Sequence, residues 1–264
     1  MKVIGLTTCL HLLSLLSFAQ LLYLSAGSNL SFTNCAPLDF VVQRYNDTRT
    51  YLSDPMDEFD NISGVGITAG MLTEDGLLFE MRWAGRNQVV SAQGIPAGET
   101  LQERDLKLRA NSYGIGIGYA MPKGNFRPGL DASIDFGAVK AYTRTGQASE
   151  VSGTGYDEIT NEINIGATMA GNIFILFNKD QTWGILLKPY YQYYFSKNDF
   201  SELNAAINPN TAIDDDPEAQ VGKLNNYGVM ILLVLGGKCV ERSCNNRRLQ
   251  SNRKFSECGF TQVG

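Results

Sequence analysis

The stretch that decides the fold runs from Asn161 to Phe195 and reads NEINIGATMAGNIFILFNKDQTWGILLKPYYQYYF. Between residues 162 and 177, mainly apolar positions alternate with small or polar ones, which places alternate side chains on opposite faces of a strand. This run is much longer than the about five or six residues of an average strand. Residues 183–195 repeat the alternation after a short polar link, so the sequence predicts two long neighbouring strands.

The same alternation predicts further strands elsewhere in the chain. They cover residues 63–72, 77–84, 105–121, 130–138 and 227–235. Within 105–121 the apolar residues change phase once, and a β-bulge near Asn111 and Ser112 would restore a common face. A weaker strand over 37–46, where Leu38, Phe40 and Val42 share one side, brings the expected number to eight.

Short and long connections alternate strictly between these strands. The short ones are residues 73–76, 122–125 and 178–181, and the long ones are 47–61, 87–103, 144–159 and 197–224. Bacterial outer-membrane barrels have short periplasmic turns, long extracellular loops and an even number of strands. The sequence therefore predicts an all-β fold, an up-and-down antiparallel transmembrane β-barrel of about eight strands over residues 37–238. Both ends of the chain are expected on the periplasmic side.

The average composition hides this pattern. The chain has 264 residues, 44% of them hydrophobic, and a net charge of −5, with a mean hydropathy of −0.13. These values exclude a bundle of membrane helices and a disordered chain. The 27 glycines fit closely packed strands better than helices.

The two faces of the expected strands differ in bulk. One face carries the large rings of Trp83, Tyr113, Tyr119, Trp183, Tyr191, Tyr193 and Phe195, as a lipid-facing aromatic girdle would. The other face is rich in glycine and carries four acids and four bases, which we assign to a lumen charge network: Glu80, Arg82, Lys107, Arg109, Asp131, Asp135, Glu162 and Lys188. A soluble lipocalin-like barrel that binds an apolar ligand is the alternative, in which the charged face would meet water.

The two ends of the chain differ from the barrel. Residues 1–19 have the apolar run and the small residues Ser17 and Ala19 that a signal peptidase reads, so we expect cleavage before Gln20, with a membrane anchor as the alternative. Residues 20–36 are then expected to form a periplasmic segment. Residues 239–264 form a basic tail that contains cysteines.

Four cysteines remain after cleavage, and an exported chain permits two disulfides of undetermined connectivity. The candidates are Cys35, Cys239, Cys244 and Cys258. A four-cysteine zinc site is the weaker alternative, because no C-x2-C pair is present.

The repeated segments Ser112–Tyr119 and Pro189–Phe195 and the Ala19–Gln20 junction resemble the small outer-membrane β-barrel family of the OmpA/OmpX type, in its Bacteroidetes version. The resemblance covers about residues 37–238 and implies a location in the bacterial outer membrane. The sequence departs from the family at its C-terminal end. Such barrels usually end on an aromatic residue of the last strand, whereas this sequence continues from Lys238 to Gly264.

The position of the only histidine argues against an enzyme. Barrel enzymes of this size are understood to use a histidine as acid or base, and the only histidine, His11, lies in the expected signal peptide. Serine–lysine chemistry stays formally open, but no spacing marks it. We therefore expect a non-enzymatic outer-membrane protein with a structural, adhesive or surface-interaction role, and no cofactor. A narrow passive, porin-like channel is the alternative, although about eight strands leave an interior that side chains fill.

The partners expected from the sequence are outer-membrane lipid and lipopolysaccharide, and extracellular or envelope proteins. Nucleic acid is not expected as a partner. Asp214, Asp215 and Asp216 offer hard oxygen ligands to a cation such as calcium. Their spacing matches no known calcium motif, so a solvated acidic loop is the alternative.

Overall fold

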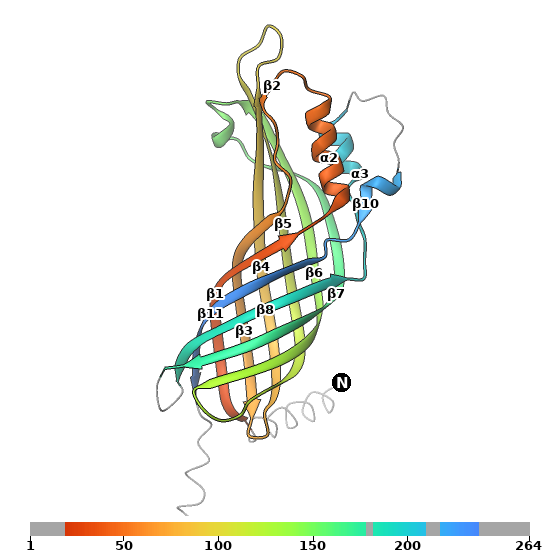
Figure 1. The fold of residues 1–264 in the computed structure, drawn as a ribbon. Coiled ribbons are helices and arrows are strands. Elements are labelled where there is room, and N and C mark those ends of the chain that lie inside the picture. The colour runs from red at the N-terminus through yellow and green to blue at the C-terminus, as the bar shows by residue number, and fades with distance from the viewer. Residues whose placement is uncertain (1–18, 178–181, 210–216, 238–264) are drawn as a thin grey trace, which may run out of the picture.

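Eight long strands form a closed antiparallel barrel in a computed structural model that describes residues 19–177, 182–209 and 217–237 (Figure 1). They are β1 (Ala19–Thr33), β3 (Asn61–Thr73), β4 (Leu77–Gly94), β5 (Gln102–Ala120), β6 (Phe126–Gln147), β7 (Asp157–Leu176), β8 (Trp183–Tyr194) and β11 (Asn226–Gly237). Each strand pairs with its neighbours in the chain, and β1 pairs with β11 to close the ring. The predicted up-and-down barrel is confirmed for the described residues.

The shorter elements lie in the connections. They are α2 (Ala36–Asp47), β2 (Leu52–Asp54), the 3-10 turn Val151–Gly153, β9 (Asn198–Asp199), α3 (Ser201–Ile207), the 3-10 turn Pro217–Gln220 and β10 (Val221–Gly222). β2 pairs with the last residues of β4, and β9 pairs with β10. No helix within the described residues is long and apolar enough to cross a membrane.

The first barrel strand differs from the prediction. Residues 37–46 form most of α2 rather than a strand, because Leu38, Val41, Val42 and Tyr45 recur at helical spacing and are buried together, and Pro37 suits the first turn of a helix. The first strand is instead β1, which pairs with β11 and β3. Residues 20–36 are therefore not a separate segment, and the barrel begins at Ala19 rather than at residue 37.

Short and long connections alternate as predicted. The short turns between β3 and β4 and between β5 and β6 lie at the same end of the barrel as Ala19 and Gly237, and we call this the proximal end (Figure 1). The third predicted short link, 178–181, lies outside the described residues. The long connections lie at the opposite, distal end, and their described residues are 34–60, 95–101, 148–156, 195–209 and 217–225.

Strands β4 to β7 are longer than the others and rise beyond them at the distal end (Figure 1). They contain 18 to 22 residues, whereas β8 and β11 contain 12 each. The predicted loops 87–103 and 144–159 were therefore too long, because their outer parts belong to these strands. The extended strands form an open trough, which α2 and α3 cover.

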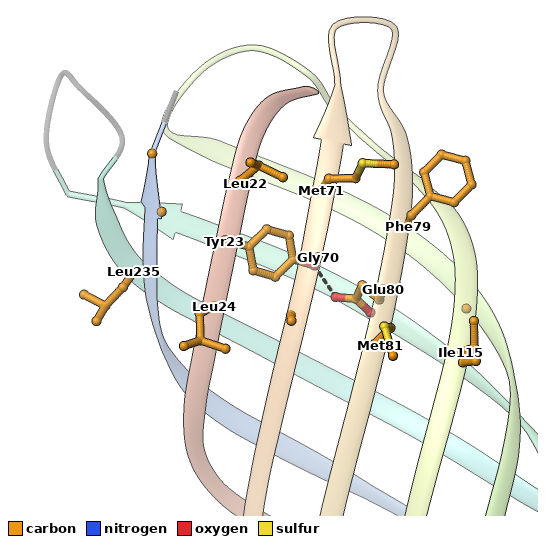
Figure 2. Close-up of a pocket in the computed structure, with 14 residues that line it drawn as sticks. Leu22, Tyr23, Leu24, Gly70, Met71, Phe79, Glu80, Met81, Ile115 and Leu235 are labelled. Atoms are coloured by element: carbon orange, nitrogen blue, oxygen red, sulfur yellow. Dashed lines mark hydrogen bonds between the residues drawn. The ribbon is translucent and has the colours of Figure 1, made fainter. Parts of the chain in front are cut away.

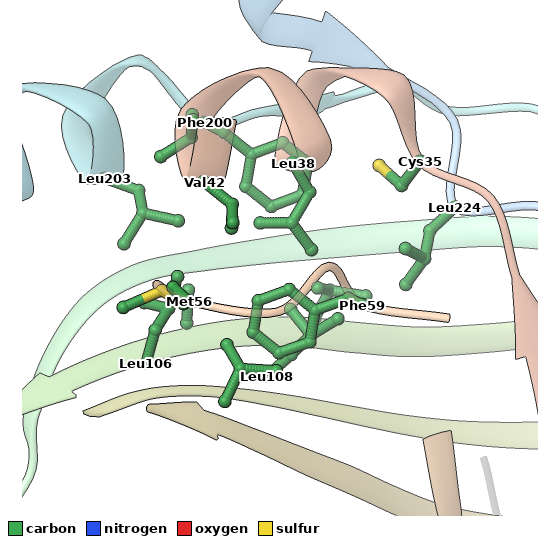
Figure 3. Packing of buried hydrophobic residues seen from close by; sticks show 14 of the residues in the cluster. Cys35, Leu38, Val42, Met56, Phe59, Leu106, Leu108, Phe200, Leu203 and Leu224 are labelled. Atoms are coloured by element: carbon green, nitrogen blue, oxygen red, sulfur yellow. The ribbon is translucent and has the colours of Figure 1, made fainter. Parts of the chain in front are cut away.

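A hydrophobic core fills this trough, and we call it the distal core (Figure 3). Leu38 and Val42 of α2 and Leu203 of α3 pack with Leu106 and Leu108 of β5, all of them almost fully buried. Phe200, Phe59 and Tyr194 add buried rings to the same cluster. The helices therefore close the distal end of the barrel.

Strand β5 has no bulge at Asn111–Ser112, and the prediction of one was wrong. Its pairing with β4 and β6 continues without a shift through these residues. Leu106 and Leu108 point inward on the same face as Ser112, while Lys107 points outward on the same face as Tyr113. The apparent phase change arises because the surroundings of both faces change: the inside turns from polar to apolar, and the outside turns from apolar to charged.

Candidate functional site: the barrel interior and the distal end

A belt of large apolar side chains surrounds the lower part of the barrel. Leu130, Ile163 and Met169 are 72%, 75% and 72% exposed. Rings on the same surface are also exposed, namely Tyr113, Tyr119, Phe126, Phe136, Trp183, Tyr191, Phe195 and Tyr227. Water-exposed surfaces of monomeric proteins rarely carry so large an apolar patch. The belt, together with the closed strand order, defines a transmembrane β-barrel, whose outer face is covered by lipid.

The centre of the barrel interior holds Lys188 between two carboxylates. The Nζ of Lys188 forms ion pairs with Glu80 and, at 2.7 Å, with Oδ2 of Asp131. Asn172 donates a hydrogen bond to the same Asp131 oxygen at 2.6 Å, and the Tyr23 hydroxyl donates to Glu80. All five side chains are buried. A buried lysine is tolerated only when it is paired in this way.

A second pair lies beside the first. Arg82 binds Oδ1 of Asp135 at 2.8 Å, and the other Asp135 oxygen accepts hydrogen bonds from Thr168 and, at 3.1 Å, from Gln192. Gly114 makes room for this pair, because a Cβ atom there would collide with Asp135 and lie 3.3 Å from Arg82. The glycine excess on the inner face thus has a steric reason at this position.

Arg86 is a third buried cation, and the sequence analysis missed it. Its guanidinium donates to Ser31 at 3.1 Å, to Asn226 at 2.8 Å and to Gln192 at 2.9 Å, and it has no carboxylate partner within the described residues. Gln192 links it to Asp135. The signal was present, because Arg86 continues the alternation of Glu80 and Arg82. Arg127, on the inner face of β6, is also fully buried, so the described barrel interior holds four buried bases against the three buried acids Glu80, Asp131 and Asp135.

The structure brings together five of the eight residues predicted for the lumen charge network. They are Glu80, Arg82, Asp131, Asp135 and Lys188. The prediction was wrong for Lys107 and Arg109, which point outward in the distal part of β5. Glu162 is half-buried opposite Val139 in the distal part of β7 and forms no ion pair with the described residues.

The other predicted site residues fall partly outside the described residues. Asp214, Asp215 and Asp216 lie there, as do residues 1–18 of the predicted signal peptide and the predicted tail 239–264 with Cys239, Cys244 and Cys258. Cys35 is a free thiol among the described residues, and the disulfide predicted for it stays a prediction because its possible partners lie outside them. Burial raises the pKa of the Cys35 thiol to about 12, which makes it unreactive at neutral pH. Within the described residues, no group of three or more potential ligands could hold a metal ion.

The interior is filled above and below the charges. An apolar layer closes the proximal end, with Leu21, Leu72, Leu78, Phe174, Leu176 and Leu186 at most 2% exposed. The distal core closes the other end. Side chains thus fill the barrel in three layers, of which the middle one is charged and the outer two are mainly apolar, with the fully buried Arg127 beside Phe174 in the proximal one.

An apolar depression lies on the outside of the barrel (Figure 2). It measures about 690 Å³ and follows β1, β3 and β4 near the proximal end, with Ala69 and Gly70 among its small residues. Leu24, Met71 and Met81 surround it. Because these residues belong to the apolar belt, the groove is a feature of the lipid-facing surface.

On the outside of the extended strands, Asp105 fastens the connection 148–156. It accepts hydrogen bonds from Arg144 and Ser91, both at 2.6 Å, and from Tyr156 at 3.2 Å. Burial alone would raise the pKa of Asp105, but these hydrogen bonds hold it below its ordinary value. The Tyr156 ring also lies against Arg144, 4.4 Å from its guanidinium carbon.

No protein-family model matches the sequence, and no curated protein matches it. Among solved structures, similar folds include the outer membrane protein OprG from Pseudomonas aeruginosa, with a TM-score of 0.41 and 11% identity over 84% of this chain and 97% of that one. Neisserial surface protein A has a TM-score of 0.40 and 12% identity over 83% and 97%. Ail, the attachment invasion locus protein of Yersinia pestis, was solved with the heparin analogue sucrose octasulfate. It has a TM-score of 0.36 and 9% identity over 82% of this chain and 97% of that one. These structural neighbours are small eight-stranded outer-membrane barrels.

Proposed function

We propose that the protein is a non-enzymatic protein of the bacterial outer membrane that does not conduct ions and acts through its distal end. The observation that carries this proposal is the filled interior. Arg82 and Lys188 are each bound to carboxylates at full burial, and apolar layers lie on both sides of them. An ion would have to displace paired charges and two packed apolar layers in order to pass.

The burial of the interior charges supports a non-enzymatic role. The five paired interior charges are bound to each other, and Cys35 is buried with a high pKa. The only histidine of the chain, His11, lies in the predicted signal peptide. A general acid or base must reach its substrate, and the buried charges do not meet this condition.

The surface divides between two kinds of partner. The apolar belt suits outer-membrane lipid, including lipopolysaccharide in the outer leaflet. The distal end suits envelope or extracellular proteins, because it combines rigid extended strands with helices. Its largest described connection, 34–60, is acidic, with Asp39, Asp47, Asp54, Asp57, Glu58 and Asp60 against Arg44 and Arg49. A basic surface on the partner would complement this charge.

Site-specific labelling of intact cells tests the orientation. Thr100→Cys lies in the exposed distal connection 95–101 and Lys123→Cys in an exposed proximal turn. Both changes are made in a chain whose Cys239, Cys244 and Cys258 are serine. A membrane-impermeant maleimide should label Thr100→Cys in intact cells and Lys123→Cys only after lysis. Labelling of Lys123→Cys alone would reverse the orientation, and labelling of neither would place the distal end away from the cell surface.

A further inference from the structure

A small cleft at the distal end gathers two arginines and two tyrosines. It measures about 310 Å³ and lies between the α2–β2 segment and the distal ends of β4 and β5. Tyr45, Arg49 and Tyr51 line one side, and Arg104 of β5 lines the other. The cleft lies beyond the distal core and shares no residue with the interior charge network.

Arg104 is half-buried and has no hydrogen-bond or ion-pair partner among the described residues. Its register partners are Ala92 and Thr145, so its side chain lies on the inner face of the extended strands, below α2. Its guanidinium carbon lies 5.7 Å from the centre of the Tyr45 ring. It forms no hydrogen bond and no ion pair with any described residue, whereas Arg82 and Arg144 each bind a carboxylate.

Arg49 is held rigidly beside it. Its guanidinium donates to the carbonyl of Tyr45 at 3.1 Å, to Asn208 at 3.0 Å and to the carbonyl of Ile207 at 2.6 Å. It also stacks 3.9 Å from the centre of the Tyr45 ring. All of these acceptors are neutral, and Arg49 forms no ion pair with a described residue.

Two cations without a described ion-pair partner therefore lie against the Tyr45 ring. Burial lowers the pKa of Arg104, and the charge of Arg49 contributes to this lowering. Glu99 and Glu103 also line the cleft, but neither forms an ion pair with Arg49 or Arg104. An anion bound in the cleft would offset the positive charge of both guanidiniums, because charge-assisted hydrogen bonds to arginine are strong.

We propose that this cleft binds the oxyanion group of a small molecule, a phosphate, sulfate or carboxylate. Arg104 supplies the hydrogen bonds to the oxyanion, and Arg49 supplies a fixed positive charge. The volume suits a ligand of about the size of a monosaccharide, at the lower end of known ligand pockets. Glu99 and Glu103, which also line the cleft, disfavour ligands that carry many negative charges.

Calorimetric titration of the purified protein in detergent, at physiological ionic strength, tests this site. The probes are inorganic phosphate, glucose 6-phosphate and glucuronate, with glucose as the neutral control. We expect saturable binding of at least one anion, none of glucose, and an at least tenfold loss of affinity in Arg104→Gln. Arg109→Gln is the matched control, because it removes the same charge from the same strand on the exposed outer face. Its affinity should equal that of the unchanged protein.

Folding of each variant is checked by heat-modifiable migration on a detergent gel, and Arg104→Lys, which keeps the charge, should bind between the two. Phosphate and glucose 6-phosphate binding equally would point to a free anion, and preference for the sugar phosphate would point to an anionic sugar. The absence of saturable binding by all three anions would overturn the proposal. Equal losses in Arg104→Gln and Arg109→Gln would also overturn it, because the effect would then be general charge attraction.

Discussion

At the scale of single residues, the barrel interior depends on matched charges. Burial of an ion costs several kcal/mol unless a partner of opposite charge is close and its remaining polar atoms are bonded. Asp135 meets this condition with Arg82, Thr168 and Gln192. Each residue is therefore supported by others, and removal of one leaves a charge behind in the interior.

Arg82→Ala is expected to destabilise the folded barrel by about 3–5 kcal/mol, because it leaves Asp135 buried without its counter-ion. The free energy of unfolding in urea, followed in detergent, measures this. Lys140→Ala is the control, since the Lys140–Glu158 pair is largely exposed, and exposed pairs contribute only about 0–1 kcal/mol. Equal effects of the two changes would contradict this account of the interior.

Gly114→Ala is expected to destabilise the barrel by about 1–3 kcal/mol, the usual effect of overpacking. The added Cβ atom would collide with Oδ1 of Asp135, which is bound to Arg82. Gly155→Ala serves as the comparison, because a Cβ atom at that position meets nothing within 4 Å. Thermal unfolding of both variants measures the difference, and an unchanged melting temperature for Gly114→Ala would show that the space is not needed.

At the scale of elements, α2 and α3 turn an open trough into a closed end. Both helices are short, α2 with 12 residues and α3 with 7, and isolated helices of this length are marginal in water. Their stability therefore comes from the distal core. Local unfolding of the helices is expected to cost less free energy than unfolding of the barrel.

Leu203→Ala is expected to lower the free energy of local opening of α3 and α2 by about 2–5 kcal/mol, because Leu203 is fully buried between them and β5. Hydrogen exchange should therefore be faster in residues 36–47 and 201–207, with little change in β1, β3 and β11. Glu202→Ala, at an exposed position of the same helix, should change neither. Faster exchange throughout the barrel would mean that the distal end and the barrel unfold together.

Asp39 makes the docking of α2 dependent on pH. Burial raises the pKa of Asp39 to about 6, and the nearby charge of Glu58 contributes. The unfolded value is about 3.9, so the folded state binds the proton more tightly and α2 loses stability as the pH rises from about 4 to 6. Asp39→Asn should therefore give α2 higher exchange protection factors at pH 7 than the unchanged chain and equal ones at pH 4. Higher protection factors for Asp39→Asn at pH 4 but not at pH 7 would contradict the expected direction of the pH dependence.

At the scale of the whole molecule, the sequence predicted the architecture but not its two ends. The alternation in residues 162–177 and 183–195 predicts the barrel, because a face against lipid must be apolar without interruption. β1 was missed because its apolar residues, such as Leu21 and Leu22, continue the run of the expected signal peptide. α2 was misread because Leu38 and Val42 fit both an alternating and a helical spacing, whereas Val41 and Tyr45 fit only the helical one.

The candidate site was predictable where the surroundings stay constant along a strand. Alternation alone assigned three interior charges correctly, namely Arg82, Asp135 and Lys188. They lie in the middle layer of the barrel, where the inner face of each strand is polar. Lys107 and Arg109 lie beyond it, where the inner face of β5 packs against helices that are remote in the sequence. Periodicity gives the face of a residue, but which face is polar depends on long-range contacts that the sequence pattern does not contain.

The measurement that tests the central claim most directly is the electrical conductance of the purified, folded protein in a planar lipid bilayer. The charged layer and the two apolar layers predict a closed barrel with no steady openings in either polarity of voltage. Arg82→Gln and Asp131→Asn leave both apolar layers intact and should remain silent. Steady openings of the unchanged protein, altered in size by these two substitutions, would contradict the account and establish a conducting path through the charge network.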